Sequence, residues 1–406
     1  MNNNRNGLIL RITPSYKYFL LLFPLFKPDT FDSLPSLHYV SIFLDLLKYT
    51  IFIVLLIRFF VYKKNLSLIS LIYPAFLLVL LISTFLNHNG NTVLHLFSTN
   101  IDLFIYFLLA NYVEEKDEYV DFLKAASFLL AFWCLANTLS VLAFYHRRYM
   151  YISNITTSIK KDRYLLGSKN YQILFILPMA SITSALDVEL VGKIRVRTLV
   201  IHILACVPLF MTAAATSIIT MIIFYVLLWI GIKKPVILRM LQIPKILVIA
   251  SIAIFGMFVV MGTHSGIARL LEMAFKKSIQ SQRSLIWTSY LKRISEKPLW
   301  GYGYMTDYMQ VLLTRVVHAH NQYLQIMFRG GIIGIIVFIL FIYSLLELSV
   351  NLNSKSGVIS CAAASAMIVA FQGDYYYSLF FYFAIVILLV HGRINSQRIV
   401  IGNRGL

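Results

Sequence analysis

The chain has 406 residues, of which 59% are hydrophobic and only 13% are charged. This balance excludes an ordinary soluble domain, because such domains are roughly half apolar and a quarter charged. The formal net charge of +19 does not indicate a nucleic-acid-binding protein, because the basic residues stand mostly between apolar runs, as in the loops of membrane proteins.

Apolar runs of about 20 residues recur along the chain, and such runs cross a bilayer as helices. We therefore predict an all-α, polytopic transmembrane helix bundle of about twelve spans. The first span is interrupted by Arg11, Pro14 and Lys17, but no signal-peptide cleavage site follows it, so it is interpreted as retained. The predicted spans are 8–26, 39–60, 66–86, 93–112, 122–145, 170–186, 198–210, 213–228, 246–263, 331–350, 357–372 and 375–390.

The spans divide the chain into three regions. Residues 1–263 hold spans one to nine, 264–330 form a large extracytoplasmic loop, and 331–406 hold the last three spans and a basic tail. We expect both termini in the cytoplasm of a bacterial cell, because basic loops favour the inner side of the plasma membrane. The basic segment 146–169, expected outside, argues against this orientation.

A few polar or reactive residues lie inside the apolar runs. Asp45 and Lys48 are three residues apart, which suits either a structural ion pair or a functional intramembrane site. Cys134, Cys206 and Cys361 fall within predicted spans, so neither a disulfide framework nor a zinc site is expected.

The large loop is predicted to be mostly helical. Leu285, Ile286, Tyr290 and Leu291 form an apolar stripe at helical spacing, 298–303 reads as a loop, and 307–327 reads as a second amphipathic helix. On such a helix His318 and His320 would point about 200° apart, so no metal site is expected. No nucleotide-binding, HExxH or GxSxG motif is present in the sequence, and no cofactor is predicted.

An ordered set of residues in this loop resembles a known signature. The set is Arg283, Trp287, Pro298, Gly301, Gly303, His320, Asn321, Leu324 and Gly331. It is similar to the pattern of the O-antigen ligase and polysaccharide polymerase superfamily of bacterial envelopes: an Arg, a Trp one turn later, a Pro before a Gly-x-Gly loop, a His-Asn before a Leu, and a Gly-rich helix start. Leu166-Gly-Ser-Lys-Asn170, which opens the sixth span, is a second and weaker match.

The sequence departs from this pattern in two places. Family members often carry a Ser-Arg near the outer end of the eighth span, where this chain has no basic residue within 213–218. They also often carry an acidic residue before the final glycine run, where this chain has Phe328-Arg329. The missing Arg leaves open which group makes a second phosphate contact.

The resemblance implies a membrane glycosyltransferase that polymerises oligosaccharide repeat units carried on a polyprenyl pyrophosphate. Ligation of the lipid-linked glycan to a lipid core or wall acceptor is the alternative within this class. A transporter or flippase of the same glycan is the alternative of another class. Inverted repeats and broken helices, which are typical of transporters, are not seen in the sequence. A structural scaffold would not require the Arg-to-His pattern.

The resemblance also implies roles for individual residues. Arg283 would clamp the pyrophosphate, because a guanidinium binds phosphate oxygens bidentately, and His320 would accept a proton from the acceptor hydroxyl. Outside the pattern, a packed histidine, an interfacial tryptophan, glycine turns and surface cations would explain the same residue types. Further substrate-binding candidates are Asn321, Trp287, Arg315, Arg329, Lys169, Asn170, Gly301 and Gly303.

The expected partners follow from the same reading. They are a polyprenyl-pyrophosphate-linked oligosaccharide and membrane lipid, with flippase and chain-length regulator proteins as further candidates and no nucleic acid.

Overall fold

The structure is a computed structural model that describes residues 14–62, 68–88, 92–144, 163–233, 249–250, 252–253, 256, 280–350 and 355–373. Nearly all of this part of the chain is helical. The described strands, β1 (Arg163–Tyr164) and β2 (Gly167–Ser168), form one antiparallel hairpin. The predicted all-α bundle is therefore confirmed.

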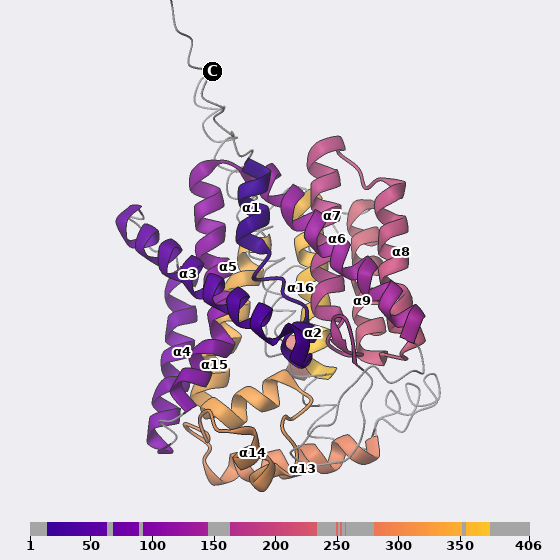
Figure 1. The fold of residues 1–406 in the computed structure, drawn as a ribbon. Helices are drawn as coiled ribbons and strands as arrows, with labels where there is room; N and C mark the ends of the chain where they lie inside the picture. The colour runs from indigo at the N-terminus through magenta and orange to yellow at the C-terminus, as the bar shows by residue number, and fades with distance from the viewer. Residues whose placement is uncertain are drawn as a thin grey trace, which may run out of the picture.

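The helices form an upright bundle with two further helices lying across one of its ends (Figure 1). The two helices across the end are α13 (Gln280–Glu296) and α14 (Asp307–Thr314). The short turn η1 (Pro35–Leu37) precedes α3. The other helices are α1 (Pro14–Leu22), α2 (Asp29–Ser33), α3 (His38–Tyr62), α4 (Leu68–Leu86), α5 (Val93–Lys116), α6 (Tyr119–Phe144), α7 (Ile173–Val191), α8 (Val196–Met211), α9 (Ala215–Lys233), α15 (Gln322–Val350) and α16 (Lys355–Gly373).

Six helices in the described part are long and apolar enough to cross a membrane: Pro35–Tyr62, Val93–Lys116, Tyr119–Phe144, Ile173–Val191, Ala215–Lys233 and Gln322–Ser344. Three shorter apolar helices, Ile72–Leu86, Val196–Met211 and Lys355–Phe371, accompany them. A multi-pass membrane protein is thus confirmed, whereas the number twelve stays a prediction. The predicted span 375–390 and most of 246–263 lie outside the described residues, and the first span is described only from Pro14.

The predicted division of one long apolar stretch into two spans is correct. Helix α8 ends at Met211 and α9 begins at Ala215. Ala213 between them has a positive φ of 48°, which lets the chain reverse within a few residues. A single helix through this stretch would exceed the thickness of a bilayer.

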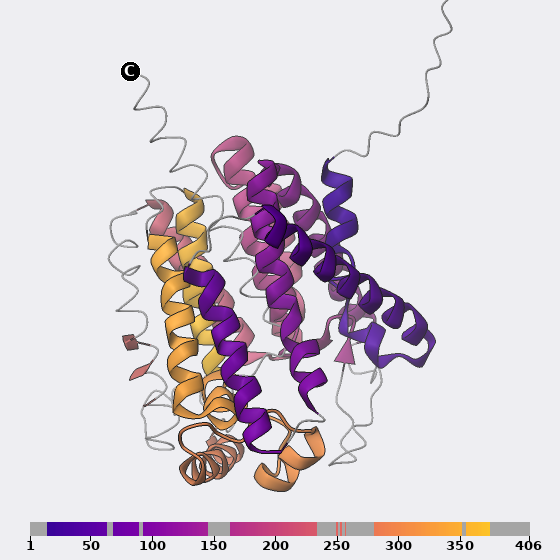
Figure 2. The ribbon, with the colours of Figure 1, turned by 90° about the vertical axis from the view of Figure 1, so that its left-hand side faces the viewer.

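Successive helices connect alternately at the two ends of the bundle (Figures 1 and 2). The hairpin and the α8–α9 turn lie in the half of the molecule nearer to α13 and α14. At the other end, Lys355 at the start of α16 donates a 2.6 Å hydrogen bond to the carbonyl oxygen of Gly192 after α7. This alternation agrees with the predicted order of crossings, while the side of the membrane that each end faces stays a prediction.

The core of the bundle is formed around α7. Within the most apolar stretch of 18 residues in this helix, 78% are buried. The helix packs against α6, α8 and α16. Helix α16 itself is rich in small buried residues, which let helix backbones approach closely in a membrane. They are Ala362, Ala363, Ala364, Ala366 and Ala370.

Asp45 and Lys48 belong to a larger charge network rather than to an isolated pair. The Lys48 ammonium lies 3.1 Å from Asp102 on α5 and 3.8 Å from Asp45. Asp45 in turn accepts from Lys27 at 2.9 Å, and Lys27 also lies 2.7 Å from Asp32 on α2. Charges at membrane depth require partners, and these contacts tie α2 and α3 to α5.

Candidate functional site

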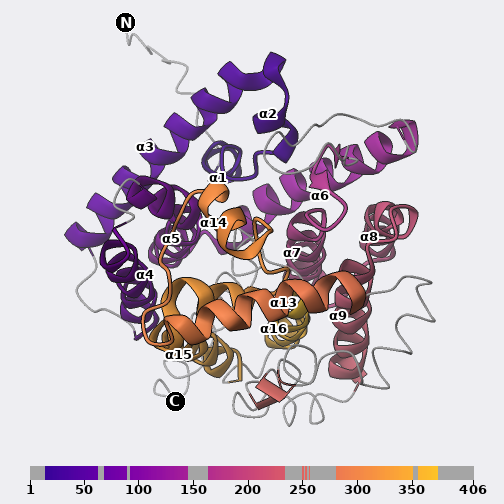
Figure 3. The same cartoon turned by 90° about the horizontal axis from the view of Figure 1, so that it is seen from below.

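The predicted site residues of the large loop lie at the end of the bundle that α13 and α14 cover (Figure 3). Arg283 stands in the first turns of α13, one turn before Trp287; its side chain lies outside the described residues. The buried stripe of α13 consists of Trp287, Tyr290 and Ile294. Leu285, expected on the apolar stripe, is instead 74% exposed. The buried face of the helix is rotated from the predicted one, so that it is centred on Trp287, Tyr290 and Ile294.

The Gly301-x-Gly303 loop fills a break in α15. Gly331 interrupts this helix with φ 63° and ψ −159°, at the residue where the span 331–350 was predicted to begin. The amides of Tyr302 and Gly303 donate to the carbonyl oxygens of Phe328 and Arg329, at 2.8 and 2.9 Å. The break is thus occupied by the protein's own backbone, which satisfies the carbonyl groups that the interruption leaves without helical partners.

The glycines of this junction are required by close backbone contacts. A Cβ on Gly331 would stand 2.1 Å from the carbonyl oxygen of Leu299, and one on Gly303 would stand 2.5 Å from the Cα of Thr84. The amide of Gly301 donates to the carbonyl of Lys297 at 3.0 Å. Because the amides of Gly301 and Gly303 both bond to backbone carbonyls, this geometry favours a structural role over the suggested phosphate contact.

Helix α4 anchors the same loop from the bundle side. Ser83 donates to the carbonyl oxygens of Trp300 and of Arg329, the latter at 2.8 Å. Asn87 donates to the carbonyl of Gly301 at 3.0 Å, and the Thr84 hydroxyl accepts from the amide of Tyr304 at 3.0 Å. These α4 residues were not predicted to belong to the site, because single Ser, Thr and Asn residues at the end of an apolar run form no recognisable sequence motif.

His320 lies in an irregular segment, and the predicted helix 307–327 is wrong. Helix α14 ends at Thr314, followed by Arg315 with φ 65°, and the next helix begins at Gln322. The Thr314 hydroxyl bonds both to the carbonyl of Gln310 and to that of Val316, at 2.8 and 2.9 Å, and such local side-chain bonds compete with helix continuation.

His318 and His320 therefore do not point apart. Their ring centroids are 4.2 Å apart, with the planes tilted by 51°. His320 has a φ of 50°, a left-handed conformation that costs a non-glycine residue about 1–2 kcal/mol. Such conformations persist where the surroundings hold them in place, and they concentrate at functional sites.

A buried set of hydrogen bonds fixes the residue before His320. The amide of Ala319 donates to the Gln325 carboxamide oxygen at 2.9 Å. Its carbonyl accepts from the Trp287 indole nitrogen at 3.0 Å. Gln310 donates to the same Gln325 oxygen at 3.3 Å and to the Tyr290 hydroxyl at 2.7 Å. Gln310 and Gln325 are both fully buried, and neither was among the site residues predicted from the sequence.

Asn321 caps the helix that follows His320. It is fully buried, and its carboxamide oxygen accepts from the amide of Leu324 at 3.0 Å. Asparagine is among the preferred residues at this N-cap position. The family-like His-Asn-x-x-Leu spacing is thus explained locally by a helix start, and the carboxamide oxygen of this substrate-binding candidate is engaged in the capping bond.

The remaining candidate cations are in different surroundings. Arg329 is 3% exposed, and its guanidinium carbon lies 4.0 Å from the ring centroid of Tyr304. Arg315 is exposed at the end of α14. Lys169 is exposed and Asn170 is half-buried, both just after the β1–β2 hairpin. That hairpin docks on α2, where Arg163 lies 3.1 Å from Asp29. Of these, only Arg329 packs into the Gly-x-Gly junction.

Electrostatic contacts also join α13 to the Gly-x-Gly loop. Glu296 at the end of α13 accepts from the Tyr302 hydroxyl at 2.6 Å and from Arg293 at 3.0 Å. These hydrogen bonds lower the pKa of the Glu296 carboxyl. Burial, with the Glu296 contact, raises the pKa of Tyr302 to about 12. Among the described residues, no group of three or more His, Cys, Asp or Glu side chains is arranged to hold a metal ion.

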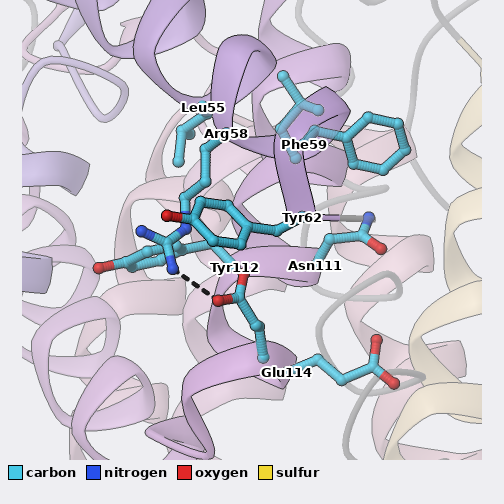
Figure 4. A pocket seen from close by; sticks show the side chains of 9 residues that line it. Leu55, Arg58, Phe59, Tyr62, Asn111, Tyr112 and Glu114 are labelled. Atoms are coloured by element: carbon cyan, nitrogen blue, oxygen red, sulfur yellow. Dashed lines mark hydrogen bonds and ion pairs between the residues drawn. The ribbon is translucent and has the colours of Figure 1, made fainter. Parts of the chain in front are cut away.

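A cavity of about 190 Å³ lies between α3 and α5, at the end of the bundle away from α13 (Figure 4). The Arg58 guanidinium in it lies 2.6 Å from Glu115 and within 5 Å of the ring centroids of both Tyr62 (4.9 Å) and Tyr112 (4.7 Å). The ion pair between Arg58 and Glu115 links α3 to α5 across this cavity. The cavity is separate from the site around His320.

Comparison with known proteins identifies part of the chain. Residues 200–339 match the family described as O-antigen ligase. This segment contains Arg283, Trp287, His320 and both halves of the Gly331 junction, whereas Lys169 and Asn170 lie outside it. A search of curated proteins finds no significant match.

Proposed function

We propose, from the membership of residues 200–339 in the O-antigen ligase family, that this membrane protein is a glycosyltransferase which polymerises oligosaccharide units carried on a polyprenyl pyrophosphate. The reaction takes place at the outer face of a bacterial plasma membrane, on the side that α13 and α14 cover. The protein uses the lipid-linked sugar itself as donor, and the products are capsule, O-antigen or exopolysaccharide chains.

One observation carries this proposal. The Trp287 indole bonds to the backbone immediately before His320, although Trp287 and Ala319 are 32 residues apart in sequence. The two ends of the family-like pattern therefore meet at one place in the fold. Arg283 belongs to the same helix one turn before Trp287, which supports a shared site for a cation and an imidazole.

The chemistry follows from the nature of the donor. An acceptor sugar hydroxyl attacks the anomeric carbon of the donor sugar, the bond from that carbon to the pyrophosphate oxygen breaks, and the polyprenyl pyrophosphate leaves. His320 takes the proton from the attacking hydroxyl. Arg283 stabilises the charge that develops on the departing pyrophosphate, which a planar guanidinium can bind through two parallel hydrogen bonds. Catalysis then consists of positioning, charge stabilisation and one proton transfer.

Ligation to a lipid core or wall acceptor is the second candidate, and the description of the matched family favours it. The two differ only in the acceptor. A transporter of the same glycan is less well supported, because the break in α15 is occupied by the Gly-x-Gly loop.

The test uses purified full-length protein in liposomes with a polyprenyl-pyrophosphate-linked repeat unit. A polymerase lengthens this substrate when nothing else is added. A ligase transfers it only after a core lipid or wall acceptor is supplied. Movement of the intact lipid-linked unit across the bilayer, with no new glycosidic bond under either condition, would exclude both enzymes and favour the transporter.

A further inference from the structure

Side chains from two different helices hold the backbone just before His320 at both of its hydrogen-bonding groups. Trp287 of α13 binds the carbonyl of Ala319 at 3.0 Å, and Gln325 of α15 binds its amide at 2.9 Å. We propose that Trp287 and Gln325 are positioning residues, which hold His320 in the orientation that the transfer reaction needs. This inference rests on the proposed function of His320.

The burial of this arrangement makes it rigid. Ala319 and Gln325 are fully buried and Trp287 is 8% exposed, so water is poorly placed to replace either hydrogen bond. A buried amide or carbonyl that loses its partner carries the full desolvation penalty. The peptide groups on either side of Ala319 therefore have one strongly preferred orientation. They determine the position and direction of the backbone at His320.

The residue after His320 is fixed as well. The Asn321 side chain caps α15 through the amide of Leu324, and its carbonyl accepts from the amide of Gln325 at 3.1 Å. His320 thus stands between two anchored neighbours in a left-handed conformation, with φ 50°, which the chain would not prefer on its own. His320 is half-buried, whereas Ala319 and Asn321 on either side of it are buried. The fold thus presents this side chain from a fixed backbone.

Gln325 connects this anchor to a second layer of buried contacts. Its carboxamide oxygen also accepts from Gln310 of α14, which donates in turn to the Tyr290 hydroxyl of α13. The three helices around the site are therefore linked through the pair Gln310 and Gln325. A change at Gln325 should displace His320 without touching Arg283, whose position depends on the first turns of α13.

The consequence for catalysis is a loss of rate rather than of binding. A general base works only within hydrogen-bond reach of the proton that it removes, and a misplacement of about 1 Å can cost about 100-fold in rate. Gln325→Met removes the acceptor but keeps a side chain of similar length. We expect it to lower kcat by about 10–100-fold with KM for the lipid-linked donor nearly unchanged. Trp287→Phe, which removes only the indole donor, should have a smaller effect of the same kind.

Gln325→Glu is the matched control, because either ionisation state of a carboxyl group keeps an acceptor oxygen for the amide of Ala319. It should retain substantially more of kcat than the Met variant. All variants are compared at equal levels of folded protein, with the thermal unfolding midpoint measured in detergent. Equal losses of kcat in the Met and Glu variants, or a loss that appears mainly in KM, would overturn the positioning role.

A double substitution separates positioning of His320 from general damage. If Gln325 acts through His320, then Gln325→Met should have little further effect on the residual activity of His320→Ala, since groups that act as a unit are not additive. Independent losses that multiply would refute the inference while leaving the proposed function intact. Normal activity of His320→Ala alone would instead refute the proposed role of His320. If the residual activity is too low to measure, the kcat and KM comparison of the Met and Glu variants decides.

Discussion

The indole nitrogen of Trp287 lies 3.0 Å from the carbonyl oxygen of Ala319 and donates a buried hydrogen bond to it. This contact joins helix α13 to the segment that carries His320. From the sequence, Trp287 was a candidate for substrate binding, with an interfacial tryptophan as the alternative interpretation. Its position within the buried cluster with Tyr290, Met305 and Phe328 instead makes it part of the framework of the site.

His320→Ala should abolish most glycan transfer while the protein remains inserted and expressed. Loss of a general base typically lowers the rate by about 10²–10⁴-fold. The measurement is turnover of the lipid-linked substrate in membranes, with the protein level determined in parallel. Near-normal turnover would contradict the catalytic assignment.

His318→Ala is not a neutral control for that experiment. The sequence analysis expected it to lie on a different helix face, but its ring centroid is 4.2 Å from that of His320. We now expect His318→Ala to have an intermediate effect, because removing its ring takes away a packing contact of His320. Lys292→Ala, at an exposed position on α13, is a better control, and it should leave turnover within about twofold of the wild type, as surface substitutions usually do.

Arg283→Lys should lose much of the activity although the positive charge is kept. An ammonium group is a point charge and cannot reproduce the two parallel hydrogen bonds of a guanidinium to phosphate oxygens. The assay is polymer synthesis at matched expression, with Arg283→Gln as the variant that also removes the charge. Full synthesis by the Lys variant would rule out the proposed bidentate clamp.

Gly331→Ala should destabilise the protein, whereas Gly334→Ala should not. A Cβ at 331 would stand 2.1 Å from the carbonyl oxygen of Leu299, and φ is 63° there. At 334 the nearest atom would be 3.7 Å away, with no such backbone requirement. We expect Gly331→Ala to lower the free energy of unfolding by about 2–3 kcal/mol. Thermal unfolding in detergent measures this, and equal midpoints for the two variants would show that the junction adapts.

The two ends of the bundle should lie on opposite sides of the membrane. Single cysteines replace Lys292 on α13 and Lys193 after α7, both exposed, in a background without Cys134, Cys206 and Cys361. We expect an impermeant thiol reagent to label position 292, but not 193, in cells with a permeable outer layer and an intact plasma membrane. The opposite labelling pattern would reverse the proposed orientation. Equal labelling at both positions would contradict the alternation of the helices.

The sequence by itself determined the class of the protein and most of its helices. Apolar runs of bilayer length leave little choice but a helix, because backbone groups in lipid must bond within their own segment. Even the division between α8 and α9, without a polar loop between them, was predictable from length. The family-like pattern likewise located Arg283, Trp287 and His320 before their surroundings were known, although their catalytic roles stay predictions.

Only the tertiary structure decided how these residues are arranged. Periodicity predicted a continuous helix through His320. In the structure, the Thr314 hydroxyl bonds to the carbonyl of Val316 where one helix ends, and the Asn321 side chain accepts from the amide of Leu324 where the next begins. The contact partners of Gly303 on α4 and of Ala319 on α13 are far away in sequence. Periodicity reports which face of a single segment is apolar, whereas these contacts depend on how separate segments pack, and that information is not contained in any one of them.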